Sequence, residues 1–141
     1  EDILPEGLIV YTEDKDGSRR EYTSNGEKEL DMPLAVLING SSASASEIFA
    51  GAIQDYGLGT LVGTTTYGKG IVQSLIPLSD GSAVKTTTAK YYTPKGRCIH
   101  GTGIEPDVEV ELAEELQQQA VISHQEDNQL QKAVEIVKDM E

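Results

Sequence analysis

Apolar and polar residues alternate near the start of the chain and predict a β-hairpin over residues 7–24. The extended runs LIVYTED and REYTS flank DKDGS, whose Asp-Gly pair is a strong turn signal. A polar connector follows over residues 25–33. The uninterrupted apolar run LAVLI at 34–38 is typical of a strand buried on both faces.

The apolar spacing changes to that of a helix over residues 41–56. The positions that recur at helical spacing are Ile48, Phe49, Ala52, Ile53 and Tyr56. The serines that precede Glu47 can cap the start of this helix, and Gly57 and Gly59 end it.

The rest of the chain reads as a run of strands followed by one helix. Strands are predicted at 60–63, 71–78 and 83–93, with a glycine-rich loop over 94–103. A C-terminal helix is expected over 123–140, because Ser123-x-x-Glu126 forms a capping-box pattern ahead of an apolar stripe.

This order of elements predicts a single α/β (α+β) domain with one mixed sheet and packing helices. A chain of 141 residues is long enough to bury a core without disulfides or metal. We expect one continuous core, formed by the strand at 34–38, the helix face, and the strands at 71–78 and 83–92.

The charge of the chain limits its partners. Twenty-four acidic residues against eleven Lys and Arg give a net charge of −13, which disfavours nucleic acid. Most of the acidic excess lies in residues 1–31 and 105–141, so the stretch from 40 to 103 holds few acids. Cys98 is the only cysteine, which excludes an internal disulfide and a cysteine metal cluster.

The segment NGSSASASE at 39–47 places small residues and hydroxyls between a strand and a helix. Backbone N–H groups and the positive end of the helix dipole face outward at such a turn, and they can stabilise an oxyanion. The competing interpretation is that these serines only cap the helix.

The segment GTTTYGKGIVQ at 63–73 places Lys69 between two glycines at the start of a strand. A lysine held in an apolar region loses water and favours its neutral amine, which can act as a base for a serine hydroxyl. Gln73 lies four residues on, so both side chains share one face of an extended strand, and its amide oxygen can orient the amine.

The same segment also matches most of a phosphate-binding P-loop, which would make the protein a nucleotide binder. Gly70 stands where such a loop needs Ser or Thr to hold magnesium. The following IVQSLIPL lacks helical spacing, although a helix follows a P-loop.

Taken together, the segments resemble the serine–lysine C-terminal processing peptidases, the tail-specific protease family. The matching runs cover roughly residues 33–112, and they are NGSSASASEI, AGAIQDYG, VGTTTYGKGIVQSLIPL, DGSAVKTTTAKYYTPKGR and GTGIEPDVEVEL. The resemblance implies a ClpP/crotonase-like core, cleavage of polypeptides near their C-terminus, no metal or organic cofactor, and an extracytoplasmic or cell-envelope location.

The resemblance also implies the roles of individual residues. Ser44 is the nucleophile rather than its serine neighbours, Lys69 is the general base, and Gln73 orients the lysine. The backbone N–H of Ala45 supplies one oxyanion donor, as the residue after the nucleophile does in other serine hydrolases.

The expected organisation is a partial peptidase core. Residues 1–33 form a hairpin and connector, residues 34–112 the catalytic region, and residues 123–140 the C-terminal helix. The family's PDZ domain and its upstream glycine-rich oxyanion segment are expected to be absent. We therefore expect these 141 residues on their own to be inactive and to self-associate through exposed strand edges. A noncatalytic peptide-binding module of the same fold is the alternative.

The remaining candidates are expected to be structural. His100 and His124 are expected to face solvent, and Cys98 to be a small buried hydrophobe. Asp55 is expected to fix the helix end or a neighbouring loop. The nearby cations Lys95 and Arg97 are expected to be solvated.

Overall fold

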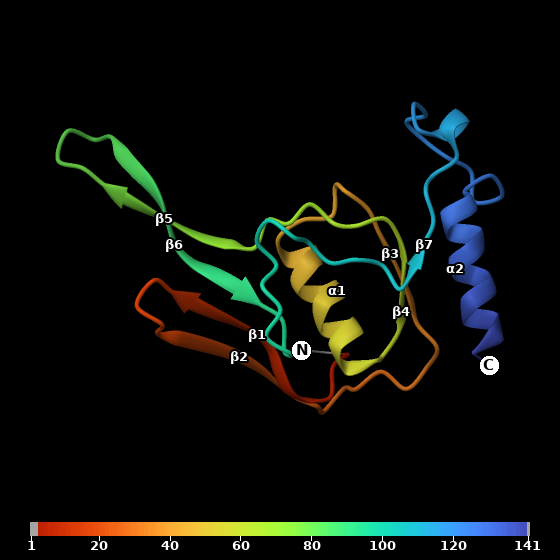
Figure 1. Ribbon diagram of the computed structural model, residues 1–141, viewed down its shortest axis with the longest axis horizontal. Helices are drawn as coiled ribbons and strands as arrows, with labels where there is room; N and C mark the ends of the chain where they lie inside the picture. Colours follow the sequence, from red (N-terminus) through yellow and green to blue (C-terminus); the bar gives the residue numbers. More distant parts are fainter. Residues whose placement is uncertain (1–2, 141) are drawn as a thin grey trace.

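The computed structural model describes residues 3–140, and its seven strands form two sheets rather than one mixed sheet. The fold class is α/β as expected, with α1 lying between the two sheets (Figure 1). The elements in chain order are β1 (Glu6–Asp14), β2 (Arg19–Asn25), β3 (Ala35–Ile38), α1 (Ala45–Tyr56), β4 (Thr60–Gly63), β5 (Ile71–Pro77), β6 (Ala83–Tyr92), β7 (Val108–Glu109), the 3₁₀ turn η1 (Glu114–Leu116) and α2 (Asn128–Asp139).

The larger sheet is antiparallel, with strand order β2-β1-β6-β5. The predicted hairpin over 7–24 is confirmed as β1 and β2. Strand β1 pairs with only the last part of β6, from Ala89 to Tyr92. The rest of β5 and β6 therefore continues beyond the sheet as a two-stranded arm, which projects from the body of the molecule (Figure 1).

The smaller sheet is parallel, with strand order β3-β4-β7. Helix α1 connects β3 to β4, as a parallel pair requires a crossover. Helix α2 packs against β3 and β4. The expectation that residues 34–38 are buried on both faces is wrong: Ile38 is buried, but Leu37 on β3 is 43% exposed. In the described residues nothing pairs with the outer edge of this strand.

The core lies between α1 and the strands around it. Its buried residues come from the start of the chain, β3, α1, β4 and the loop after β6, and they are Leu4, Ile38, Ala50, Ala52, Ile53, Leu61, Ile99 and Ile104. The prediction that 71–78 and 83–92 belong to this core is wrong for the arm. Leu75 is 70% exposed and Val84 is 47% exposed, because no third strand or helix covers this part of the arm.

The C-terminal helix begins later than the capping-box pattern predicts. Ser123 and Glu126 do interact, through a hydrogen bond of 2.6 Å between their side chains, but they form a turn before the helix. The N-cap of α2 is Asp127, whose carboxylate accepts from the N–H groups of Gln129 and Leu130. No helix in the described part of the chain is long and apolar enough to cross a membrane.

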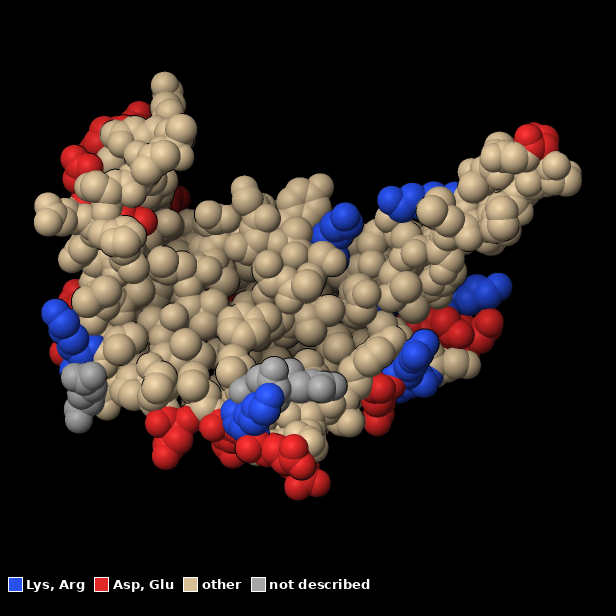
Figure 2. All heavy atoms as spheres, turned by 180° about the vertical axis from the view of Figure 1, so that it is seen from behind, with Lys and Arg blue, Asp and Glu red and all other residues tan. Residues whose placement is uncertain are grey.

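Acidic side chains dominate the charged surface. In the view from behind, Asp and Glu gather along one edge and at the two ends of the molecule (Figure 2). Uncharged residues cover most of the middle of that face. The arm of β5 and β6 ends in a turn that contains Asp80, so the acids at that end lie outside residues 1–31 and 105–141, which hold most of the acidic excess.

Candidate active site

The turn between β3 and α1 holds its serine in a strained conformation. Ser44 is the N-cap of α1, with φ 57° and ψ −113°, and it is the only non-glycine residue with positive φ in the described chain. Such a conformation costs about 1–3 kcal/mol and persists only where surrounding contacts impose it. Serine capping of a helix does not require this backbone, since an ordinary N-cap residue is extended. The strain therefore singles out Ser44 among the serines of this turn.

The helix start directly after Ser44 provides a site for negative charge. Ala45 is the first residue of α1, so its N–H lies among the first-turn groups that have no intrahelical acceptor. The positive end of the helix dipole adds to the effect. Both Ser44 and Ala45 are exposed residues.

The loop that carries Lys69 packs its backbone tightly against the loop after β6. A Cβ on Gly70 would lie 2.4 Å from the backbone nitrogen of His100, and a Cβ on Gly68 would lie 3.1 Å from the nitrogen of Gly103. Gly68 also has φ +83°, and its carbonyl accepts from the N–H of Gly101 at 3.0 Å. The two glycines that flank the lysine thus permit a close approach of two backbones.

One buried carboxylate joins the serine turn to the lysine loop. Glu47, in the first turn of α1, is 0% exposed. Its Oε2 accepts from the N–H groups of Ser44 at 2.9 Å and Lys69 at 2.8 Å. Its Oε1 accepts from the N–H of Gly68 and the hydroxyl of Thr66, both at 2.6 Å. A single side chain therefore fixes the backbone at both candidate catalytic residues.

Two further hydrogen bonds support this junction. The Thr66 hydroxyl, which donates to Glu47, also accepts from the N–H of Ile104 at 2.8 Å. The N–H of Tyr67 donates to the carbonyl of Ser42 at 2.9 Å. Buried networks of this kind are rigid when every member is satisfied, and no described buried side-chain N or O atom lacks a partner.

An open cavity of about 730 Å³ lies beside the junction, where Lys69 lines it, whereas Ser44 and Glu47 are not among its lining residues. Its lining comes from the serine turn, the lysine loop, the start of β5 and the loop after β6, and the residues are Gly40, Ser41, Ala43, Tyr67, Lys69, Ile71, Gln73 and His100. Lys69 and Gln73 line the same cavity, but Lys69 precedes β5 and the register of β5 shifts between Val72 and Gln73, so the alternation of a regular strand does not explain it. Among the described residues, no hydrogen bond joins the Lys69 amine to the Ser44 hydroxyl.

Two expectations about the cavity residues need correction. The Lys69 side chain is exposed, so the expectation that its glycine neighbours remove it from water is wrong. The glycines bury the backbone of this loop instead, because they pack against 99–103. His100 is exposed as expected, but it faces the same cavity as Lys69 rather than a remote surface.

Asp55, at the opposite end of α1, forms a separate cluster. Its carboxylate accepts from the N–H of Lys95 at 2.8 Å and pairs with the Arg97 guanidinium at 2.5 Å. Arg97 also donates to the side chain of Gln54. The expectation that Asp55 fixes a neighbouring loop is confirmed, whereas the expectation that Arg97 is simply solvated is wrong. Cys98 is half-buried rather than buried.

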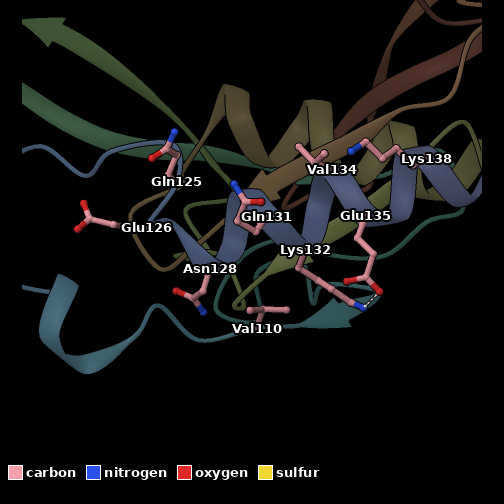
Figure 3. Close-up of a pocket in the computed structure, with 9 residues that line it drawn as sticks. All are labelled: Val110, Gln125, Glu126, Asn128, Gln131, Lys132, Val134, Glu135 and Lys138. Carbon is pink, nitrogen blue, oxygen red and sulfur yellow. Dashed lines mark hydrogen bonds and ion pairs between the residues drawn. The ribbon is translucent and has the colours of Figure 1, made fainter.

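A second hollow of about 680 Å³ lies along α2 (Figure 3). Its charged side chains include the ion pair of Lys132 and Glu135 at 2.9 Å. None of the nine residues drawn around it is a serine, threonine, cysteine or histidine. This hollow therefore lacks a hydroxyl, thiol or imidazole group, and the cavity beside the serine turn is the better candidate for a serine-type site.

Sequence reasoning missed Glu47 and Thr66 as parts of the site. The spacing Ser44-x-x-Glu47 is a capping-box pattern, and it does report one of the contacts, from the Ser44 N–H to the Glu47 carboxylate. Nothing in local spacing indicates that the same carboxylate also binds residues 66–69, which lie about twenty positions further along the chain.

Comparison with known proteins places this arrangement in a family. The profile of peptidase family S41 matches residues 1–110. A carboxyl-terminal-processing protease of Synechocystis sp. is 54% identical over 108 residues, which are 77% of this chain and 25% of that protein. The chloroplastic C-terminal processing peptidase of Tetradesmus obliquus is 41% identical over 110 residues, 77% of this chain and 24% of that protein.

A solved structure shares both the sequence and the fold. The photosystem II D1 C-terminal processing protease aligns with a TM-score of 0.75 and 40% identity, covering 78% of this chain and 29% of that one. This alignment confirms the expected fold class. The chain spans about a quarter of the length of the curated relatives it matches.

Proposed function

The chain belongs to peptidase family S41, and on that premise we propose that it supplies the catalytic serine–lysine region of a C-terminal-processing serine endopeptidase. Ser44 is the nucleophile, Lys69 the general base, and Ala45 an oxyanion donor. The single observation that carries the proposal is the junction at Glu47, which holds the backbone of Ser44 and of Lys69 through one carboxylate.

In the proposed reaction, the neutral Lys69 amine takes the proton from the Ser44 hydroxyl as the oxygen attacks the scissile carbonyl carbon. The resulting oxyanion accepts a hydrogen bond from the Ala45 N–H. The Lys69 ammonium then gives its proton to the leaving amine as the peptide bond breaks. Water, deprotonated by the same amine, hydrolyses the acyl-enzyme and releases the carboxylic acid and Ser44.

The open cavity around Lys69 fits a polypeptide substrate. A bound chain would cover the exposed amine, exclude water from it and so favour its neutral form. Gln73 lines the same cavity and can accept a hydrogen bond from the amine without adding a charge. We propose that it is a positioning residue, so that Gln73→Ala lowers kcat less than Lys69→Ala does.

The protein that contains this chain is proposed to act outside the cytoplasm on the C-terminal regions of polypeptides, as the family resemblance implies. Residues 1–141 on their own are proposed to fold but to show little or no proteolysis. The family's second oxyanion donor lies in a segment for which residues 1–43 offer no match, and losing one such donor costs about 10²–10³ in rate. The test is turnover by the isolated 141 residues beside the full-length enzyme.

The catalytic assignment is tested in the full-length enzyme with an unstructured polypeptide substrate and a fluorophosphonate probe. Ser44→Ala should abolish labelling and cleavage, and Lys69→Ala should come close to it. The double variant should be scarcely worse than either single one, because members of one catalytic unit are not additive. Lys138→Ala removes a lysine from the last turn of α2 and serves as the matched control.

Three outcomes would contradict the proposal. Substantial cleavage by Lys69→Ala together with loss of activity in His100→Ala would assign the base to the histidine that shares the cavity. Peptide binding without labelling or cleavage would identify a noncatalytic peptide-binding module. Equal loss in the Lys138 control would show that the effect is not specific to Lys69.

A further inference from the structure

Strand β5 forms a free edge that starts at the candidate active site. It is the last strand in the order β2-β1-β6-β5, so only β6 pairs with it in the described structure. Gln73, at its near end, lines the active-site cavity. Beyond a bulge between Val72 and Gln73, the register with β6 is unbroken as far as Pro77.

The hydrogen-bond phase of the hairpin shows which backbone groups face this edge. The N–H of Leu78 donates to the carbonyl of Ser82 at 2.8 Å, which makes these two residues a hydrogen-bonded pair. Hydrogen-bonded and non-bonded pairs alternate along an antiparallel ladder. The N–H and C=O groups of Gln73 and Leu75 therefore point away from β6, toward the free edge.

The far end of the edge is closed to a new strand. Pro77 occupies the next outward-facing position and has no N–H to donate. Beyond it the chain turns, and Asp80 fixes that turn by accepting from the hydroxyl and the N–H of Ser82, which lowers the pKa of the Asp80 carboxyl. The outward donors are thus confined to Gln73 and Leu75, the two positions closest to the cavity.

Apolar side chains accompany these free backbone groups. Leu75 is 70% exposed and Ile76 is 50% exposed. A two-stranded ribbon without a covered apolar face is only marginally stable in water. An extended polypeptide that pairs with the edge would satisfy the backbone groups and cover part of this surface. Free strand edges are a common means of capturing extended peptides.

We propose that the outer edge of β5 at Gln73 and Leu75 binds the substrate polypeptide as an added strand and leads it into the cavity of Lys69. The inference rests on the proposed function. A second copy of the chain is a poorer fit, because pairing between two long ribbons would need outward N–H donors along the whole arm, and Pro77 at the end of β5 has none. The outward N–H groups of Gln73 and Leu75 lie at the cavity end of β5, which suits a substrate polypeptide that must also reach Ser44.

The test is binding of a fluorescein-labelled peptide of alanine, valine and serine to the full-length Ser44→Ala enzyme, measured by fluorescence anisotropy. Leu75→Pro removes the outward N–H and should weaken binding about five- to tenfold, the worth of one hydrogen bond and its paired geometry. Leu75→Ala keeps the N–H and is the matched control, with a smaller loss from the missing side chain. With Ser44 present, Leu75→Pro should raise KM and leave kcat nearly unchanged.

A second measurement leaves the enzyme unaltered. Single N-methyl groups moved along the peptide should weaken binding at every other residue near the cleavage site, because only alternate N–H groups face β5. Equal affinity of Leu75→Pro and Leu75→Ala, or no alternation in the N-methyl series, would overturn the proposal. Loss of self-association by Leu75→Pro with unchanged peptide affinity would assign the edge to a second copy. Ser44→Ala enzyme that still cleaves would instead refute the proposed function.

Discussion

The two ends of α1 each carry a buried carboxylate, and the two are satisfied in different ways. Glu47 lies in the first turn, where the helix dipole favours negative charge, and its four donors are backbone N–H groups and a hydroxyl. Asp55 lies in the last turn, where the dipole disfavours negative charge, and it pairs with the Arg97 guanidinium. The carboxylate at the C-terminal end of α1 is therefore paired with a cation, whereas the carboxylate at the N-terminal end has only uncharged donors.

The difference separates catalysis from stability. Glu47 joins two segments that each carry a proposed catalytic residue. Because its four donors are uncharged, no cationic partner of Glu47 lies there to bind an oxyanion or to repel the Lys69 ammonium. Asp55 joins the helix to the loop at 95–97, and none of these residues lines the cavity. We therefore expect changes at Glu47 to appear in activity and changes around Asp55 to appear mainly in unfolding.

The largest expected effect is that of Glu47→Gln in the full-length enzyme. The amide keeps the size of the side chain, but its NH₂ group faces N–H donors in place of a carboxylate oxygen. We expect kcat/KM to fall about 100-fold or more, because small misplacements of catalytic groups have effects of that size. Asp55→Asn, assayed in parallel at a temperature where both variants are folded, should stay within a few-fold of wild type. Equal losses in the two variants would remove the distinction between the two ends.

A smaller effect is expected from Thr66→Val, which removes one donor to Glu47 and the acceptor for the Ile104 N–H. The other three donors remain, so we expect kcat/KM to fall about tenfold, the worth of one buried hydrogen bond. Thr93→Val is the matched control, since Thr93 is also buried but its hydroxyl accepts from the backbone N–H of Arg97. A kinetic loss in the control as large as in Thr66→Val would attribute the effect to general loosening.

The smallest kinetic effect is expected from Arg97→Ala. It leaves the Asp55 carboxylate with the Lys95 N–H but without its cation, and it should lower the free energy of unfolding by about 1–2 kcal/mol. Because Arg97 is 44% exposed, this value is below that of a fully buried pair. Urea unfolding measures the change, and kcat/KM should remain near wild type. An activity loss comparable with that of Glu47→Gln would couple the Asp55 cluster to the site.

How far the sequence predicts this molecule depends on whether a signal is local. The Asp-Gly turn of the first hairpin and a helix within residues 41–56 follow from turn chemistry and spacing, and the structure confirms both, with α1 beginning at Ala45. The expected contact of Asp55 with a neighbouring loop is also confirmed. The start of α2 was misplaced because Ser123 and Glu126 make the side-chain contact of a capping box within a turn that ends before the helix.

Tertiary contacts explain the remaining errors. Apolar spacing placed Leu75 in the core, but the strands divide into two sheets and leave this residue on a projecting arm. The glycines around Lys69 suggested a buried amine, but they serve a backbone contact with 99–103. The role of Glu47 depends on residues 66–69, so the sequence shows its capping partner and not its part in the site.

The most direct test of the central claim is a structure of the full-length enzyme with a peptide-derived inhibitor bound at Ser44. We predict that the Lys69 amine lies within about 2.6–3.2 Å of the Ser44 oxygen, with the Ala45 N–H directed at the oxyanion position. We also predict that Glu47 still accepts from the N–H groups of both Ser44 and Lys69. A complex in which Ser44 and Lys69 occupy separate pockets, or in which the Glu47 junction is broken, would contradict the central claim.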